Sequence, residues 1–160
     1  TVPPPAGVSV IRVETAAEMA AAVARALPAD AAVMAAAVAD WRVTNASDRK
    51  LKKDGTGQPP ALQFVENPDI LRETSASAQR PELVIGFAAE TDDVLSNAAA
   101  KLARKGCDWI IANDVSIAGT MGGDDNAVSI IRKHGIERWA RTSKTDVARK
   151  LAETIALELS

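Results

Sequence analysis

Asp40 has the residue type and the position of a ligand-binding carboxylate. It lies just after the continuous apolar run AAVMAAAV (31–38), which is typical of a strand buried on both faces. A carboxylate at the mouth of such a strand can accept hydrogen bonds from a ligand or bind a divalent cation. It can also simply end the strand and cap a turn, and the spacing alone leaves both interpretations open.

A lysine cluster follows in a polar segment that contains two glycines. Lys50, Lys52 and Lys53 form the run KLKK. A basic, glycine-containing loop can close over phosphates, where it neutralises their charge and excludes water. The alternative is a charge run that is exposed to solvent, which is the more usual outcome. We interpret residues 40–60 as a long mobile flap.

Two more lysines lie within a predicted helix at 91–106. Lys101 and Lys105 are four residues apart and therefore share one face of that helix. Like charges at this spacing repel each other, so an anion bound between them would be stabilising. An ordinary solvated helix surface is the alternative, and the neighbouring Arg104 favours it.

Asn67 and Pro68 predict the start of a helix. Asparagine is a preferred N-cap residue, and proline is favoured at the first helical position. The free backbone N–H groups at such a start can bind an anion. Simple capping is the commoner reason for this pair of residues.

Three other side chains could take part in binding or catalysis. Phe87 follows a glycine near a strand end, where it could stack on a base or fill the core, and the scarcity of aromatic residues favours the core. The single histidine, His134, precedes a glycine in an apparent hairpin turn, which favours an exposed turn residue. The single cysteine, Cys107, is expected to be a small buried side chain.

Buried apolar strands alternate with helices along the chain. The predicted strands are 8–13, 31–38, 61–65, 82–89 and 108–114 with a hairpin around 134–135, and the predicted helices are 15–27, 91–106 and 143–160 with one starting at 67. This order predicts an α/β fold with a mostly parallel sheet and an antiparallel edge hairpin. Ligands bind beyond the carboxyl ends of strands in such sheets, where Asp40 and Phe87 are expected.

Length and composition bound the function. With 160 residues, 47% hydrophobic and 25% charged, the chain is expected to form one globular domain. A net charge of −2 argues against nucleic-acid binding, and no apolar run is long enough for a membrane span. The proline-rich start does not resemble a signal peptide, so we expect a cytoplasmic protein. One cysteine and one histidine exclude an internal disulfide and a multi-histidine metal site.

Six segments together resemble the bacterial, CTP-using phosphopantothenoylcysteine synthetases, the phosphopantothenate–cysteine ligases of coenzyme A biosynthesis. They occur in the order and spacing of that family, over nearly the whole chain. The segments are AAAVADWR (35–42), KLKK (50–53), ENPDIL (66–71), VIGFAAET (84–91), IIANDVS (110–116) and DDNAV (124–128).

The resemblance implies a Rossmann-like fold, a homodimer and a two-step ligation. The carboxylate of 4'-phosphopantothenate attacks CTP to give an acyl-cytidylate and pyrophosphate, and the amine of cysteine then displaces CMP. A divalent cation, normally Mg²⁺, accompanies the nucleotide. Such chemistry requires charge neutralisation and positioning more than a protein nucleophile.

The resemblance also assigns roles to individual residues. Lys50 corresponds to the first lysine of a flap over the active site and is the one residue to which we give a catalytic role. The expected nucleotide-binding residues are Met34, Ala35, Ala36, Asp40, Lys50, Pro68, Asp69, Ile70, Leu71, Phe87, Lys101 and Lys105. No direct metal ligand is assigned.

The family's N-terminal third is missing from this sequence. That third carries a glycine-rich strand–turn–helix and part of the acyl-substrate site, so we expect a companion N-terminal segment to complete the fold. In many bacteria the ligase is also fused to a flavin-dependent decarboxylase. The alternative function is a nucleotide-binding module that is inactive in this truncated form. A generic dinucleotide oxidoreductase is disfavoured because the sequence has no GxGxxG motif.

Overall fold

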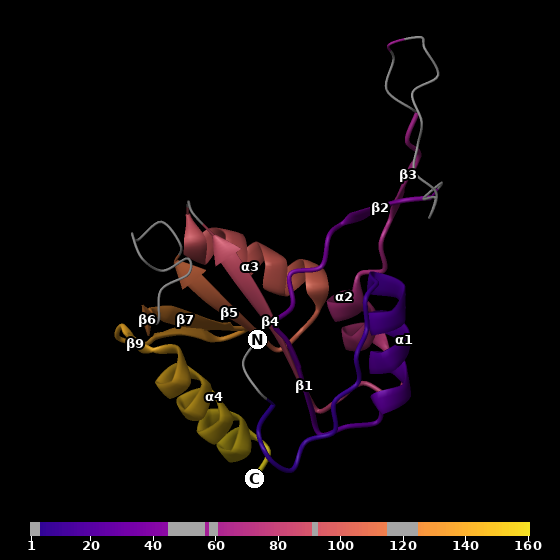
Figure 1. Ribbon diagram of the computed structural model, residues 1–160. Coiled ribbons are helices and arrows are strands. Elements are labelled where there is room, and N and C mark those ends of the chain that lie inside the picture. Colours follow the sequence, from indigo (N-terminus) through magenta and orange to yellow (C-terminus); the bar gives the residue numbers. More distant parts are fainter. Residues whose placement is uncertain (1–3, 45–56, 58–60, 91–92, 115–124) are drawn as a thin grey trace.

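A five-stranded mixed sheet forms the centre of the computed structural model, which describes residues 4–44, 57, 61–90, 93–114 and 125–160 (Figure 1). The strand order is β1 (Ala31–Met34), β4 (Leu83–Glu90), β5 (Trp109–Asp114), β7 (Val128–Arg132) and β8 (Gly135–Arg138). The first three strands are parallel, and β7 and β8 are antiparallel to their neighbours. The predicted mostly parallel sheet with an antiparallel edge hairpin is confirmed.

Helices cover both faces of this sheet (Figure 1). Alternating residues of β4 and β5 point to opposite faces, so Ile85 and Ile111 pack with α4 (Lys144–Glu158) in one core cluster. Val84 and Ile110 belong to the other cluster, which α3 (Val94–Lys105) covers. The shorter elements are α1 (Ala16–Ala26), α2 (Ile70–Ala76), β2 (Trp41–Val43), β3 (Phe64–Glu66), β6 (Asp125–Asn126) and β9 (Thr142–Ser143). None of the helices in the described part of the chain is long and apolar enough to cross a membrane.

Several local predictions are confirmed in detail. Thr15 and Glu18 form a reciprocal capping box at the start of α1, which ends just before Pro28. Gly106 ends α3 in the left-handed conformation, with φ of 68°, which glycine adopts without strain. His134 is exposed in the turn between β7 and β8, and Cys107 is buried.

Two predicted strands differ from the structure. Residues 8–13 form no strand, and the side chains of Val8, Val10 and Ile11 are 54%, 56% and 60% exposed. A segment rich in β-branched residues becomes a strand only where a neighbouring strand supplies hydrogen bonds. None of the described strands pairs with this segment. The predicted strand 31–38 ends at Met34, so residues 35–38 are irregular and exposed.

The predicted N-cap of α2 is wrong by two residues. The helix begins at Ile70, and its N-cap is Asp69, whose carboxylate accepts a hydrogen bond from the backbone N–H of Arg72 at 3.2 Å. Aspartate caps as well as asparagine does. Asn67 is therefore available for other contacts.

Gly86 allows α2 to lie close to β4. A Cβ at this position would come within 2.5 Å of Leu71 Cδ2 and 3.0 Å of Ile110 Cδ1. Any larger side chain would push Leu71 away from the strand end. Gly86 thus positions the start of α2 relative to the sheet.

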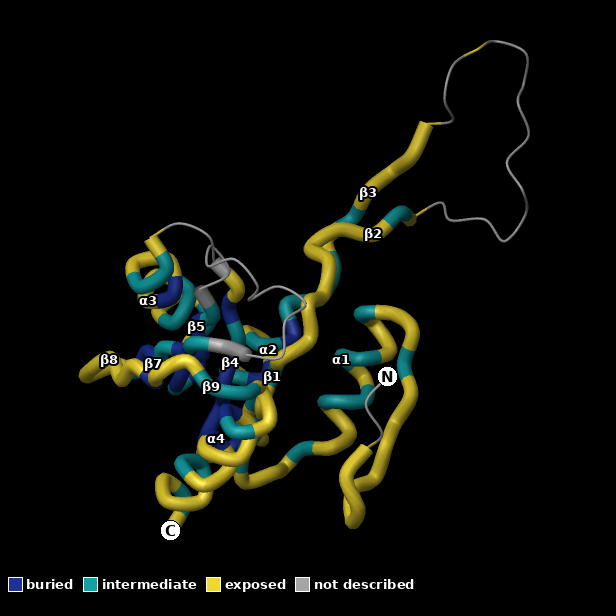
Figure 2. The backbone as a smooth tube through the Cα atoms, turned by 60° about the vertical axis from the view of Figure 1, so that its left-hand side comes forward, coloured by how far each residue is buried: buried dark blue, intermediate teal, exposed yellow. Residues whose placement is uncertain are grey.

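An antiparallel ribbon of β2 and β3 projects from the body of the molecule, as Figure 2 shows. We call this ribbon and its two connections to the body, residues 39–44 and 61–67, the arm. Trp41 and Phe64 on the arm are 57% and 61% exposed. The arm contains parts of the predicted flap at residues 40–60, whereas Lys50 lies outside the described residues.

Candidate functional site

A cleft of about 1190 Å³ lies at the carboxyl ends of β1 and β4. Its walls are α1, α2 and α3, and its upper rim is the base of the arm. All of the predicted nucleotide-binding residues within the described part of the chain line this cleft: Met34, Ala35, Ala36, Asp40, Pro68, Asp69, Ile70, Leu71, Phe87, Lys101 and Lys105. Residues that lie far apart in the sequence are thus brought together, because parallel strands end at the same side of a sheet.

The segment after β1 gives the cleft an accessible backbone. Met34 is half-buried, and Ala35 and Ala36 are exposed on the cleft wall. Because a methyl group hides little of the main chain, a ligand can reach the peptide groups of these residues directly. Phe87 lies across from them on β4 and is only partly covered by the core.

Lys105 and Asp69 form an ion pair across the floor of the cleft. Lys105 Nζ donates to Asp69 Oδ2 at 2.5 Å, and the two side chains are 18% and 27% exposed. Burial raises the pKa of the Asp69 carboxyl, but the hydrogen bonds from Lys105 and from the Arg72 backbone outweigh it. The pKa of Asp69 therefore lies below its ordinary value. This pair joins α3 to the N-cap of α2.

Lys101 lies one turn earlier on α3 and contacts β4. Its Nζ donates to the carbonyl oxygen of Phe87 at 2.8 Å. The bond leaves two of the three ammonium protons for other acceptors. Lys101 thus places a positive charge beside the second half of β4.

Asn67 holds the base of the arm together. Its Nδ2 donates to the carbonyl oxygen of Ala39 at 2.8 Å, and its backbone N–H donates to that of Asp40 at 2.8 Å. Its Oδ1 accepts from Arg42 Nη1 at 3.3 Å, and the same nitrogen donates to the Glu66 carbonyl oxygen at 2.8 Å. Because an amide side chain can both donate and accept, Asn67 bonds to Ala39 and to Arg42 of the facing segment at the same time. These hydrogen bonds hold the backbone of residues 39–42 in place, and with it the backbone of Asp40.

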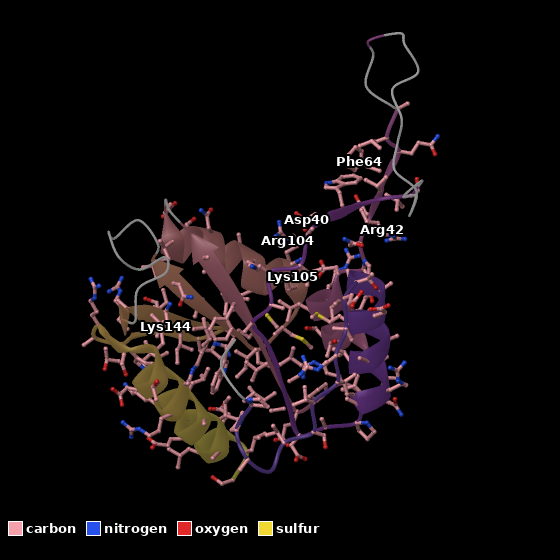
Figure 3. All side chains as sticks on the ribbon, viewed as in Figure 1. Asp40, Arg42, Phe64, Arg104, Lys105 and Lys144 are labelled. Carbon is pink, nitrogen blue, oxygen red and sulfur yellow. The ribbon has the colours of Figure 1, made fainter. Side chains whose placement is uncertain are left out.

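Asp40 presents an exposed carboxylate to the cleft (Figure 3). The carboxylate forms no hydrogen bond or ion pair with any residue that the structure describes. Within the same residues, no three His, Cys, Asp or Glu side chains come together as a metal-binding group. Magnesium is commonly bound by one or two protein carboxylates and the phosphates of a substrate. The donors fit a cation that enters together with a phosphorylated ligand.

Three arginines line the cleft that were not among the predicted binding residues: Arg42, Arg72 and Arg104. Arg42 lies at the base of the arm, and Arg104 lies on α3 between the two lysines. Because Arg104 comes three residues after Lys101, the sequence already placed it on the same side of the helix as Lys101 and Lys105. The position of Arg42 could not be predicted from spacing in this way, because its hydrogen-bond partner Asn67 is distant in the sequence.

The Lys105–Asp69 pair predicts how a variant responds to pH. A carboxyl whose pKa is depressed by folding adds stability above its unfolded pKa, and this stability is lost as pH falls through the folded pKa. Lys105→Met removes the hydrogen bond and the charge of Lys105, both of which lower the pKa of Asp69, so this pKa rises in the variant. We expect the variant to lose about 1–2 kcal/mol of unfolding free energy at pH 7 and less at pH 3, as measured by urea titration. Lys133→Met, in an exposed turn, is the control. An equal loss at both pH values would contradict this role.

Comparison with protein families identifies the fold and its relatives. Residues 1–158 match the DNA/pantothenate metabolism flavoprotein C-terminal domain, abbreviated DFP. The chain belongs to this family. The match spans almost the entire sequence, so the cleft and the arm are both parts of the DFP domain.

Curated relatives of this DFP domain are named coenzyme A biosynthesis bifunctional protein CoaBC. The protein of Vibrio cholerae is 39% identical over 148 residues, which are 91% of this chain and 37% of the relative. That of Mycobacterium tuberculosis is 38% identical over 167 residues, covering 98% of this chain and 40% of the relative. The chain thus spans about two fifths of the relatives that it matches.

Two solved structures share the fold of this DFP domain. The crystal structure of the C-terminal domain of a CoaBC protein aligns with a TM-score of 0.76 at 29% identity, over 99% of this chain and 69% of the other. A DNA/pantothenate metabolism flavoprotein from Streptococcus pneumoniae aligns with a TM-score of 0.77 at 18% identity, over 98% and 76% of the two chains. The Rossmann-like α/β fold expected from the sequence is confirmed.

Proposed function

We propose that this chain is the nucleotide-binding body of a cytoplasmic phosphopantothenate–cysteine ligase of coenzyme A biosynthesis. The observation that carries the proposal is the cleft at the end of β1 and beside β4. The residues expected to bind the nucleotide gather there from four separate sequence segments. The family and the names of its relatives are in keeping with this activity.

The proposed reaction begins when a carboxylate oxygen of 4'-phosphopantothenate attacks the α-phosphorus of CTP. A new P–O bond forms, the bond to pyrophosphate breaks, and an acyl-cytidylate results. The amine of cysteine then attacks the acyl carbon, releasing CMP and one proton to solvent. The first step brings a carboxylate toward a polyphosphate, and the second releases CMP as an anionic leaving group, so both depend on cations such as Lys101 and Lys105.

Mg²⁺ would enter this site with the phosphates of CTP. Asp40, whose carboxylate is exposed on the cleft, would hold it more readily than Asp69, which is already engaged with Lys105 and with the Arg72 N–H. The cation would supply further charge neutralisation on the polyphosphate. The amide of Asn67 holds the backbone of Asp40 in place.

The cleft supports a choice of CTP over ATP. The small side chains of Ala35 and Ala36 and the partly covered Phe87 leave room for a single-ring base against the backbone. Peptide groups can distinguish the donors and acceptors of cytosine from those of adenine by hydrogen bonding. We expect calorimetric titration with the magnesium salts to give at least ten-fold tighter binding of CTP than of ATP. Equal affinities would contradict the assignment to the CTP-using ligases.

An open strand edge supports the proposal of a companion N-terminal segment. No strand within the described ranges pairs with the edge of β1 opposite β4, and Val33 on that strand is 46% exposed. Parallel strands are ordinarily buried and paired on both sides. The exposed apolar segment 8–13 is a second surface that a companion could cover. This edge also favours the alternative function, a nucleotide-binding module that is inactive until such a segment completes the acyl-substrate site.

The arm supports the proposal that the ligase is a homodimer. Trp41 and Val43 lie on one face of β2, and Phe64 lies opposite Val43 on β3. A two-stranded ribbon is marginally stable in water unless its apolar face is covered. A second copy of the chain presents the same apolar face, and a symmetric contact between two arms would cover both. A further domain, such as a flavin-dependent decarboxylase, is a separate proposal. It is supported by the word "bifunctional" in the names of the longer relatives.

A further inference from the structure

Three cations on α3 face the cleft and differ in what they contact. Lys101, Arg104 and Lys105 stand at i, i+3 and i+4, so they occupy one side of the helix. Lys105 is paired with Asp69, and Lys101 donates to the Phe87 carbonyl oxygen. Both ammonium groups are therefore partly used in holding α3 to α2 and to β4.

Arg104 differs from the two lysines. Its side chain is exposed on the cleft wall, and it forms no hydrogen bond or ion pair with the part of the chain that the structure describes. Figure 3 shows Arg104 and Lys105 near the labelled Asp40, below the base of the arm. A guanidinium group offers five donors in a planar fork, which matches two oxygens of a phosphate. Its charge is fully available to an entering anion.

The other arginines of the cleft have competing contacts. Arg42 uses Nη1 for Asn67 and the Glu66 carbonyl oxygen at the base of the arm. Arg72 stands beside Asp69, and its charge contributes to the lowered pKa of that carboxyl. Arg104 has no carboxylate partner of this kind among the described residues.

We propose that Arg104 binds the polyphosphate tail of the nucleotide, as an additional phosphate ligand next to Lys101 and Lys105. This inference rests on the proposed function, because it places a nucleoside triphosphate in the cleft. None of the described residues occupies the guanidinium before the nucleotide enters. Lys105 can contact phosphate fully only by weakening its pair with Asp69. Arg104 thus provides the first complete positive charge that the tail meets.

The test compares Arg104→Gln with the unmodified protein in calorimetric titrations at low salt. We expect about ten-fold weaker binding of CTP and of inorganic tripolyphosphate, which corresponds to about 1.4 kcal/mol. Binding of cytidine, which lacks phosphates, should be unchanged. The difference for CTP should shrink at high ionic strength, because exposed charges are screened. Arg104→Lys should restore part of the affinity.

Arg138→Gln is the matched control, because Arg138 is an exposed arginine on β8, away from the cleft. If the unmodified protein bound CTP and Arg104→Gln bound it equally well, the role of Arg104 would be refuted and the proposed function would stand. If the unmodified protein bound neither CTP nor tripolyphosphate, the proposed function itself would fail. A loss of cytidine binding in Arg104→Gln would show a structural role and would also overturn the inference. Circular dichroism of each variant checks that it is folded.

Discussion

Replacing Lys50 by alanine is expected to reduce turnover by about 10²–10³-fold while the unfolding free energy stays unchanged. The reason is electrostatic: a flap lysine meets charge that develops on the phosphates in the transition state, and such groups typically contribute this much. Lys50 lies outside the described residues, so its position over the cleft is a proposal from the sequence resemblance. Steady-state CMP release and a urea titration of the same preparation measure the two quantities.

Lys53→Ala is the matched control for this experiment. It removes the same charge from the same KLKK run, three residues further along. If Lys50→Ala retained normal turnover, Lys50 would be an ordinary solvated lysine. If both variants were equally impaired, the flap would act through its overall charge and not through one residue.

The second large effect is expected at the arm. The double variant Trp41→Ser/Phe64→Ser should convert a homodimer into a monomer. These two side chains, 57% and 61% exposed, are the largest apolar groups on the ribbon. Aromatic anchors at the centre of an interface contribute a large share of its binding energy. Sedimentation equilibrium over a range of protein concentrations measures the mass directly.

Leu157→Ser provides a control for surface hydrophobicity. Leu157 is 78% exposed on α4, remote from the arm. The dimer proposal predicts that this variant keeps the oligomeric state of the unmodified protein. If the unmodified protein were monomeric, or if the arm variant stayed dimeric, the proposed role of the arm would be wrong. A measured mass that exceeds that of the chain by the mass of a shorter polypeptide would instead reveal a bound companion segment.

Local signals in the sequence predicted most of the body of the fold. The capping box of Thr15 and Glu18 and the glycine at 106 act through neighbouring residues, so they could be read without tertiary information. The segment 8–13 shows the limit of this approach. Its apolar residues have the composition of a strand, but strand formation depends on a partner that no local pattern supplies.

The cleft was predictable where it follows from topology. Phe87 on β4 and the end of β1 meet there because adjacent parallel strands run to the same side of a sheet. Asp40 also lines the cleft, but it lies just before β2 at the base of the arm and not at the mouth of β1 as predicted. The role of Asn67 was not predictable, because its amide bonds to residues 25 and 28 positions away in preference to capping the nearby helix. The sequence favoured a solvated helix surface around Arg104, because nothing in the sequence shows that this side of α3 borders a cleft.

Release of CMP tests the central claim most directly. The protein is incubated with MgCTP, 4'-phosphopantothenate and cysteine, each of which is also omitted in turn, and CMP is quantified by chromatography. The account predicts that CMP accumulates in proportion to the ligated product, that it requires both acyl and amine substrates, and that MgATP supports far less turnover. CMP formed at the same rate without 4'-phosphopantothenate or cysteine, or no CMP from a folded, CTP-binding protein that carries its companion segment, would contradict it.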